Sequence, residues 1–227
     1  MNVGVLGTGI VGRTLARGLS DIGHDAMIGT RDPAALSARD ERDAMGNEPF
    51  PEWHANHPSI GVGTFADAAA HGAMIFNATS GAGSIDALRL AGEANLEGKV
   101  LVDVSNPLDF SRGFPPSLLV ANTDSLAERI QREFPAARVV KSLNTMTAAL
   151  MVDPTAVAAG DHVVFVSGDD ADAKQEVAAL LREGWGWKHV VDLGDLSSAR
   201  AAEMYLPLWV RLLRALDTPM FNISLVR

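Results

Sequence analysis

Short runs of β-branched and other apolar residues alternate along this chain with alanine-rich segments whose apolar positions recur every three or four residues. The spacing from Val11 to Ile22 predicts a helix over residues 10–22, which Gly23 is placed to end. Valine-rich strands separated by helices predict an α/β fold with a mostly parallel, doubly wound sheet covered on both faces. The strands are predicted at residues 3–6, 26–29, 61–64, 73–78, 100–104, 138–142, 162–166 and 189–192, and a second helix at residues 65–71.

Two stretches interrupt this alternation. Residues 38–58 are polar and contain prolines, and this composition predicts a long loop. Residues 106–124 contain Pro107, Pro115 and Pro116, and we expect a second irregular connection there. Because long loops in compact domains often carry function, both are candidate rims of a site.

Composition excludes several classes of protein. The 227 residues include no cysteine, which removes disulfide scaffolds, thiol nucleophiles and cysteine-ligated metals. A net charge of −9 argues against nucleic-acid and membrane partners, which need clustered positive charge. Neither a signal peptide nor a membrane-spanning run is visible, so we expect a soluble, cytoplasmic protein. His54 and His57 have no convincing third ligand nearby, and we expect no bound metal.

The strongest motif is Gly7-Thr8-Gly9-Ile10-Val11-Gly12, which follows the first strand and opens the first helix. In this pattern Gly7 allows a tight turn, Gly9 lets a pyrophosphate approach the backbone, and Gly12 permits close helix–strand packing. The free N–H groups of the helix N-terminus favour phosphate binding. The motif therefore predicts a Rossmann-type dinucleotide-binding domain over residues 1–148, followed by a small α/β portion over residues 149–227.

The end of the second strand bears on the choice of cofactor. Dinucleotide domains that bind NAD usually place Asp or Glu there to hold the ribose 2′-hydroxyl. This chain has Thr30 and Arg31 instead, a hydroxyl and a guanidinium that suit a 2′-phosphate, and NADP is therefore the favoured cofactor. Asp32 follows one residue later, which leaves NAD as the alternative.

Three segments together resemble one family. The glycine motif, the strand end Thr30-Arg31-Asp32-Pro33 and the segment Val139-Val140-Lys141-Ser142-Leu143-Asn144-Thr145 are similar to those of the NADP-dependent reductases of the deazaflavin coenzyme F-420. The stretch that starts at Asp192 also resembles members of that family, whereas the segment 38–58 has no clear counterpart. The resemblance implies hydride transfer between C4 of the nicotinamide and C5 of the deazaflavin, a coenzyme with an anionic tail. No dense basic patch that could receive that tail is visible in the sequence.

The resemblance also implies site residues. Gly7 and Gly12 shape the turn, and four residues would line the pyrophosphate: Thr8, Gly9, Ile10 and Val11. Thr30 and Arg31 would hold the 2′-phosphate. The strand-end residues that would flank the ribose and nicotinamide are Ala78, Thr79, Ser80, Ser105 and Asn106. Asn144 and Thr145 would face the cavity shared by the two rings. No residue is assigned as a catalytic acid or base, because the cofactors supply the reactive atoms.

Other functions stay open at this point. The NADPH-dependent reductase could serve another acceptor, such as a flavin, a quinone or a ferric chelate, or the chain could sense NADP without turnover. Lys141 and Asn144 also match the Lys-x-x-Asn pair of β-hydroxyacid dehydrogenases, but that class needs a large helical domain, and the residues after 150 still contain strand-like runs. Otherwise Lys141 is expected to be a strand-end cation whose ammonium reaches water. The apolar segment 204–216 makes a homodimer a candidate assembly.

Overall fold

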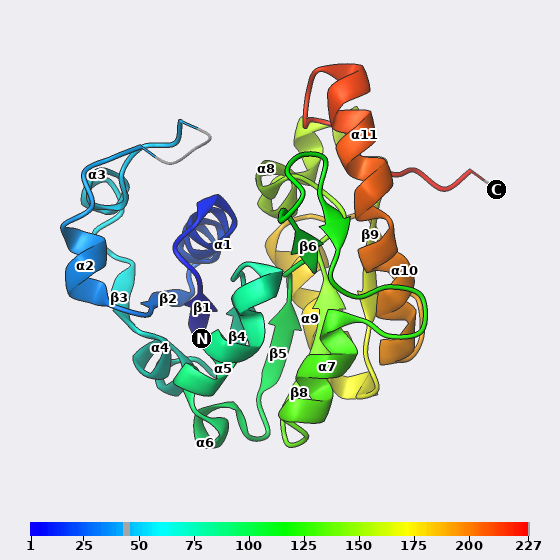
Figure 1. Cartoon of the computed structure of the whole chain (residues 1–227). Coiled ribbons are helices and arrows are strands. Elements are labelled where there is room, and N and C mark those ends of the chain that lie inside the picture. The colour runs from blue at the N-terminus through cyan, green and yellow to red at the C-terminus, as the bar shows by residue number, and fades with distance from the viewer. Residues whose placement is uncertain (43–45, 227) are drawn as a thin grey trace.

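A computed structural model describes residues 1–42 and 46–226 of the chain, and a single large sheet runs through its centre (Figure 1). Its strand order is β10-β9-β8-β5-β4-β1-β2-β3. A small separate hairpin pairs β6 with β7. The strands are β1 (Asn2–Leu6), β2 (Asp25–Thr30), β3 (Gly61–Thr64), β4 (Met74–Asn77), β5 (Val100–Asp103), β6 (Leu108–Asp109), β7 (Ser117–Leu118), β8 (Arg138–Ser142), β9 (Val163–Ser167) and β10 (His189–Asp192).

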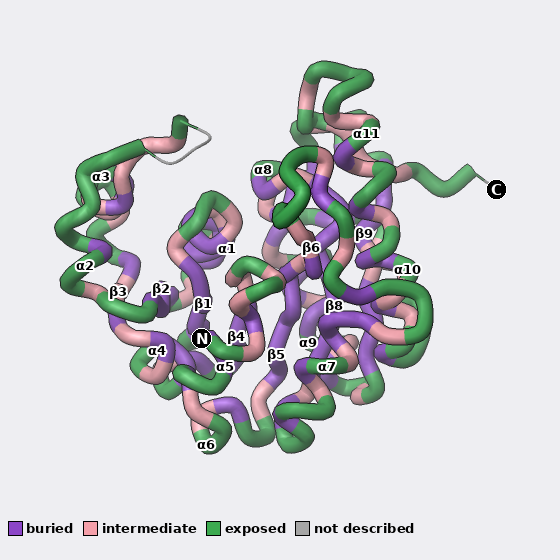
Figure 2. The backbone as a smooth tube through the Cα atoms, in the orientation of Figure 1, coloured by how far each residue is buried: buried purple, intermediate pink, exposed green. Residues whose placement is uncertain are grey.

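Helices cover both faces of the sheet, and the buried residues form one apolar cluster on each face (Figure 2). Residues of α1, α3, α8 and α9 pack into the first cluster, and residues of α4, α5, α6, α7 and α10 into the second. The sheet is therefore doubly wound, as predicted. The helices are α1 (Ile10–Asp21), α2 (Pro33–Ser37), α3 (Phe50–Ala55), α4 (Phe65–His71), α5 (Ser84–Ala91), α6 (Glu93–Leu96), α7 (Leu126–Glu133), α8 (Ala148–Val152), α9 (Ala171–Ala179), α10 (Ala199–Met204) and α11 (Leu206–Leu216).

Local sequence signals account for the best-predicted elements. Helix α4 matches its predicted range because Thr64 caps it: the Thr64 hydroxyl accepts a hydrogen bond from the backbone N–H of Asp67, whose carboxylate accepts from the N–H of Thr64. Helix α1 ends at Asp21, and Gly23 follows with a φ of 83°, in the left-handed region that favours glycine.

The order of the strands fixes where a ligand can bind. From β3 through β2, β1, β4 and β5 to β8, neighbouring strands are parallel and follow the order 3-2-1-4-5-6 of dinucleotide-binding sheets. The order reverses between β1 and β4, which opens a crevice at the carboxyl ends of these strands. Strand β9 then joins β8 antiparallel, and β10 pairs parallel with β9. The predicted C-terminal portion thus continues the same sheet.

The prediction of a long loop over residues 38–58 is wrong for residues 50–55, which form a helix; the other described residues of this stretch, 38–42, 46–49 and 56–58, lie in neither helix nor strand, and residues 43–45 lie outside the described residues. Helix α3 occupies Phe50–Ala55, with Phe50 and Trp53 buried against the core. The prolines misled the prediction, because Pro51 stands in the first turn of α3, where proline is compatible with a helix. We refer to residues 46–58 as the insert.

The second irregular region largely matches the prediction. Within residues 106–124, only Leu108–Asp109 and Ser117–Leu118 form short strands, and they pair antiparallel as the β6–β7 hairpin. Its tip carries the exposed side chains of Phe110 and Phe114. Over residues 1–42 and 46–226, no helix combines the length and the apolar character needed to span a bilayer.

Candidate functional site

The turn between β1 and α1 has the geometry that the glycine motif requires. Gly7 adopts a φ of 123°, and a Cβ there would lie 2.6 Å from the Ala78 carbonyl oxygen. At Gly12 a Cβ would lie 2.0 Å from the carbonyl oxygen of Gly7, so only glycine lets α1 pack this closely. Around Gly9, by contrast, no described atom lies within 4 Å of an added Cβ. The motif therefore leaves open space beside the first turn of α1, whose N–H groups have no acceptor within the helix.

Arg13 connects this turn to the insert. Its side chain is buried, its Nε donates to the Thr8 carbonyl at 2.9 Å, and its Nη1 donates to the Glu48 carbonyl at 2.7 Å. The guanidinium also lies over the rings of Phe50 and Trp53, at 5.3 and 5.9 Å from their centroids. The sequence analysis missed this residue, which lies one position beyond the glycine motif.

The end of β2 places Thr30 and Arg31 in different surroundings. Thr30 is buried, whereas Arg31 is exposed. Asp32 is the N-cap of α2, because its Oδ1 accepts a hydrogen bond from the backbone N–H of Ala35. This capping role uses one oxygen of the carboxylate that the NAD alternative would assign to a ribose, and the arrangement is consistent with the predicted preference for NADP.

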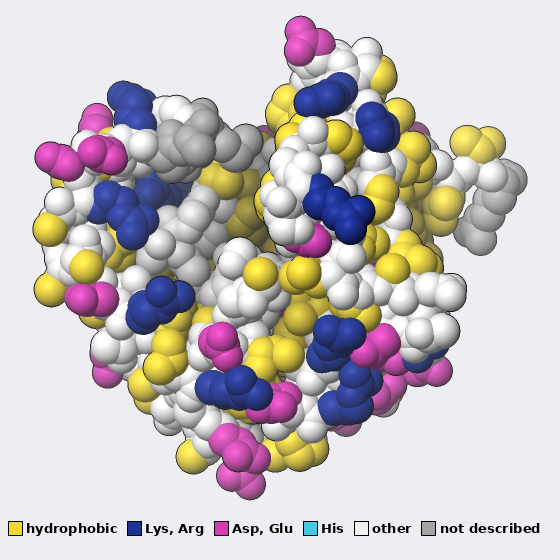
Figure 3. Space-filling view, in the orientation of Figure 1, with side chains coloured by type: hydrophobic (Ala, Val, Ile, Leu, Met, Phe, Trp, Pro, Cys, Tyr) yellow, Lys and Arg dark blue, Asp and Glu magenta, His cyan; other side chains and the backbone are white. Residues whose placement is uncertain are grey.

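A cavity of about 450 Å³ lies at the carboxyl edge of the sheet. It brings together six of the predicted site residues: Val11, Ala78, Thr79, Ser80, Ser105 and Asn106. In Figure 3 the surface is hollowed between the insert on the left and α11 with the β6–β7 hairpin on the right. A hollow of about 500 Å³ near Met1 and Met74 lies at the opposite, amino edge, away from the glycine turn.

The cavity is also lined by residues that the sequence analysis did not assign. They are Gly81, Ala82, Val104, Leu108, Asp109, Phe110 and Leu119. Most come from the irregular region 106–124, which was predicted to form a rim of the site. The order of polar and apolar residues in that region does not indicate which side chains face the cavity. Gly81 is required by a close approach, since a Cβ there would lie 2.0 Å from the carbonyl oxygen of Asn106.

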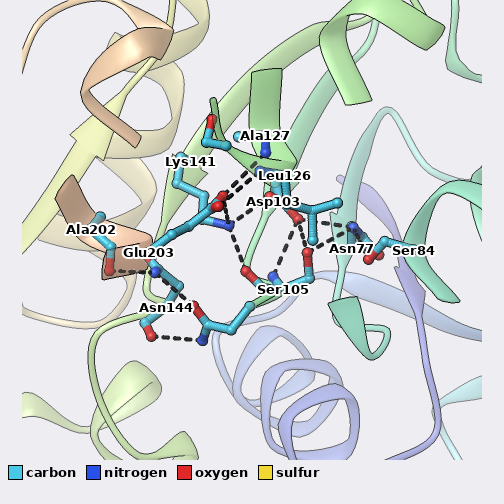
Figure 4. Close-up of polar contacts among 12 residues, drawn as sticks. Asn77, Ser84, Asp103, Ser105, Leu126, Ala127, Lys141, Asn144, Ala202 and Glu203 are labelled. Carbon is cyan, nitrogen blue, oxygen red and sulfur yellow. Dashed lines mark hydrogen bonds and ion pairs between the residues drawn. The ribbon is translucent and has the colours of Figure 1, made fainter. Parts of the chain in front are cut away.

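A buried polar network supports the floor of this cavity (Figure 4). Asp103 accepts hydrogen bonds at Oδ1 from the Ser105 hydroxyl, at 2.6 Å, and from the Asn77 amide, at 2.9 Å. The Oδ1 of Asn77 in turn accepts from the Thr79 hydroxyl at 2.6 Å. Ser105 and Thr79, from two neighbouring strand ends, are therefore held through one carboxylate.

The expectation that the ammonium of Lys141 reaches water is wrong. The side chain is 1% exposed, and its Nζ lies 2.7 Å from Asp103 Oδ2 and 3.0 Å from Glu203 Oε1. Burial lowers the pKa of Lys141, but the two carboxylates outweigh burial and raise it above the ordinary lysine value. Sequence could not reveal this, because Asp103 and Glu203 lie far from Lys141 along the chain.

Asn144 and Thr145 are buried and are not among the residues that line the cavity. Asn144 reaches it indirectly: its amide donates to Asn106 Oδ1, and the Asn106 amide donates to the Asn144 carbonyl, each at 2.9 Å. Thr145 lies beside this pair in the chain.

The two histidines considered as metal ligands have other contacts. A ring nitrogen of His54 is 2.8 Å from the Ile60 carbonyl oxygen, and one of His57 is 2.7 Å from that of Trp53. The His54 ring also stacks on Phe50, so both residues help to pack the insert.

Comparisons with known proteins agree with this geometry. The family described as NADP oxidoreductase, coenzyme F-420-dependent, matches residues 2–107. The crystal structure of a candidate F-420-dependent NADP-reductase from an Arthrobacter species is 56% identical, with a TM-score of 0.96 and 100% of both chains covered.

More distant relatives share the fold. An imine reductase from Myxococcus stipitatus, solved with NAD⁺, has a TM-score of 0.60 at 18% identity, over 95% of this chain and 63% of that one. The metalloreductase STEAP3 of Rattus norvegicus is 32% identical over 91% of this chain, which spans only 37% of that relative's length. The glycine turn, the sheet order and the full-length similarity lead to one assignment: the chain belongs to the family of coenzyme F-420-dependent NADP oxidoreductases.

Proposed function

We propose that this protein transfers hydride between NADP(H) and a planar acceptor of the deazaflavin type, coenzyme F-420. The observation that carries this proposal is the cavity of about 450 Å³ beside the glycine turn, at the point where the strand order reverses. Ligands of open α/β sheets bind at that point. The full-length similarity to the Arthrobacter protein supports the choice of acceptor.

The chain's own residues would bind and orient both molecules. The N–H groups of the first turn of α1 and the open space at Gly9 would receive the diphosphate, and Arg31 would pair with the 2′-phosphate. Thr79, Ser105 and Asn106 would then lie beside the nicotinamide and its ribose. When bound, the nicotinamide would supply the hydride, and the acceptor would gain that hydride together with one proton from solvent.

Apolar side chains would exclude water from the ring cavity. Val11 lies on the side of the glycine turn, and Leu108, Phe110 and Leu119 come from or flank the β6–β7 hairpin. Rate acceleration then rests on alignment and desolvation of two rings, and no side-chain acid or base is required.

An arginine cluster next to the hairpin supports an acceptor with an anionic tail. The guanidinium of Arg214 lies over the Phe114 ring, 4.4 Å from its centroid, and Arg211 is one turn earlier on the same face of α11. Arg112 lies in the hairpin tip. All three are exposed; among the described residues Arg211 and Arg214 form no ion pair, whereas the charge of Arg112 acts, after the hydrogen bonds from Ser111, to lower the pKa of the nearby Asp109. Lys and Arg side chains gather here beside the hollow (Figure 3).

A second acceptor class is favoured by one specific observation, the similarity to the metalloreductase STEAP3 over most of this chain. In that case the same NADPH site would serve a flavin or a ferric chelate. Both proposals use the same NADPH site, formed by the glycine turn and the carboxyl edge of the sheet. They differ only in which acceptor binds in the cavity beside the nicotinamide.

The test is an acceptor profile. The purified protein is mixed anaerobically with NADPH and either coenzyme F-420, FMN, a quinone or a ferric chelate, and the absorbance of NADPH is followed. We expect turnover with coenzyme F-420 at a kcat/KM well above that of the other acceptors. Turnover only with FMN or ferric chelate would replace this proposal by the second, and NADP binding without any oxidation would indicate a sensor.

A further inference from the structure

The buried ion cluster of Lys141, Asp103 and Glu203 has a composition that stability alone does not explain. Each of the three side chains is at most 1% exposed. Ion pairs this deeply buried pay a desolvation cost that the attraction between the charges barely offsets, and apolar side chains of similar volume are often as stable. We therefore expect the cluster to have a second role.

All donors of the Lys141 ammonium are used within the protein. Besides the two carboxylates, Nζ donates to the Ser105 carbonyl. Lys141 is not among the residues that line the cavity, so its proton is not presented to a ligand there. This arrangement excludes the acid–base role that the Lys-x-x-Asn spacing allows.

Two short paths lead from the cluster to the cavity. On one side, Ser105 is fixed at three points: its carbonyl by Lys141, and its N–H and hydroxyl by Asp103 Oδ1, at 3.2 and 2.6 Å. On the other side, Asp103 holds the amide of Asn77, which orients Thr79. Figure 4 shows these contacts converging on Asp103 from two strands.

Glu203 brings helix α10 into the same arrangement. Its carboxylate accepts the backbone N–H groups of Leu126 and Ala127 at 2.8 and 3.1 Å, at the N-terminus of α7. These groups compensate the second negative charge of the cluster. The preceding residue, Ala202, accepts a hydrogen bond from the Asn144 amide at 3.1 Å. Helix α10 is thereby tied to the strand ends beneath the cavity at two adjacent residues.

We propose that Lys141, Asp103 and Glu203 are positioning residues that set Thr79 and Ser105 against the nicotinamide half of the bound dinucleotide and anchor α10 to that floor. This inference rests on the proposed position of NADP(H). The cluster acts on ring alignment and leaves the diphosphate and 2′-phosphate contacts unchanged, because those lie at the glycine turn and at the end of β2. Loss of the cluster should therefore affect turnover far more than nucleotide affinity.

The test compares Lys141→Met and the double variant Lys141→Met/Asp103→Asn with the wild type. The double variant removes one positive and one negative charge, so the net charge of the buried cluster is unchanged. It replaces the single variant in the test if the single variant does not fold. Three readouts are needed: the NADP dissociation constant by calorimetry, kcat and the KM for NADPH with whichever acceptor the wild type reduces, and the fluorescence of bound NADPH. The last reports how firmly the nicotinamide is held and needs no acceptor.

We expect kcat to fall on the order of ten- to a hundredfold, with the NADP dissociation constant changed less than about threefold. In the cluster variants, bound NADPH should show a lower fluorescence intensity and a lower fluorescence anisotropy than in the wild type, because its nicotinamide is held less firmly. Lys174→Met is the matched control: Lys174 also bonds an aspartate, Asp192, and a carbonyl, that of Gly194, but away from the cavity. We expect this control to match the wild type.

A folded cluster variant with wild-type kcat and fluorescence would overturn the inference. So would an equal loss in the Lys174→Met control, since that would indicate a general effect of removing a lysine. If the wild type itself neither binds NADP nor oxidises NADPH, the proposed function fails, and that result is separate from the comparison among variants.

Discussion

Asn106 and Asn144, 38 residues apart in the chain, exchange two hydrogen bonds of 2.9 Å, and only Asn106 reaches the cavity. The Asn144 amide also donates to the Ala202 carbonyl. One side chain therefore joins the end of β5, the segment after β8 and helix α10.

We predict that Asn144→Ala lowers the free energy of unfolding by about 2–4 kcal/mol, because it removes two hydrogen bonds and leaves buried polar partners unpaired. Urea denaturation measures this loss. The control is Asn95→Ala, which removes a single bond to the Ala91 carbonyl and should cost only about 1 kcal/mol. Equal losses in the two variants would contradict the role of the pair.

Substitution of Gly9 should weaken NADP binding, whereas substitution of Gly12 should destabilise the fold. Gly9 has a φ of −73°, which alanine adopts without strain, and its Cβ would meet no described atom within 4 Å. Gly9→Ala should keep the melting temperature but weaken NADP binding at least about tenfold, because the methyl group occupies the approach of the diphosphate. Gly12→Ala should destabilise the fold by about 3 kcal/mol or more, since its Cβ would overlap the Gly7 carbonyl. Calorimetry and thermal unfolding separate the two outcomes, and a destabilised Gly9→Ala protein would be inconsistent with this geometry.

Arg31 should determine the preference between the two nicotinamide cofactors. We expect Arg31→Ala to weaken NADP binding by about 2 kcal/mol and to leave NAD binding unchanged, because only NADP carries the 2′-phosphate. Isothermal calorimetry with both nucleotides tests this. Arg17→Ala, which removes an exposed guanidinium near Asp21, should change neither affinity. A parallel loss for both nucleotides would reject the assignment of Arg31.

The arginine cluster predicts a dependence on the tail of the acceptor. Replacement of Arg211 and Arg214 by alanine should raise the KM for coenzyme F-420 by about tenfold at low salt, because two charge-assisted contacts are lost. A deazaflavin without the anionic tail should keep its KM, and steady-state kinetics with the two acceptors make the comparison. The same rise for both acceptors would mean that the arginines act through packing, for example through the stacking of Arg214 on Phe114.

Acid should weaken the fold partly through Asp124. Hydrogen bonds from Arg132 and Arg129 lower the pKa of this carboxyl from 3.8 to about 2. Because the folded-state pKa is depressed, its stabilising contribution is present above about pH 4 and disappears as the pH falls towards 2. Asp124→Asn should therefore unfold more readily than the wild type at pH 7, and thermal scans should show this gap closing at low pH. A gap that is the same at pH 7 and pH 2 would exclude this electrostatic origin.

Much of the fold could be predicted because its signals are local. The apolar runs marked both ends of each large-sheet strand to within about one residue, and the Thr64–Asp67 capping pair fixed the start of α4. The glycine motif placed the turn correctly, since a positive φ at Gly7 and contact at Gly12 can be met by no other residue.

The remainder depends on contacts between distant segments. The i and i+3 spacing of Phe50 and Trp53 in α3 was hidden by Pro49 and Pro51, and the helix is stabilised by the core and by Arg13. The burial of Lys141 depends on Asp103 and Glu203, which no local pattern connects to it. The assigned cofactor contacts, the division at residue 148 and the homodimer stay predictions.

Through Arg13, the insert contacts the glycine turn, although the two segments lie far apart in the sequence. The same guanidinium holds the Thr8 carbonyl and rests on two aromatic rings of a segment inserted after β2. Natural variation at Phe50 or Trp53 would therefore shift the turn at which we propose that the diphosphate binds, and homologues would then differ in nucleotide affinity through residues outside that turn.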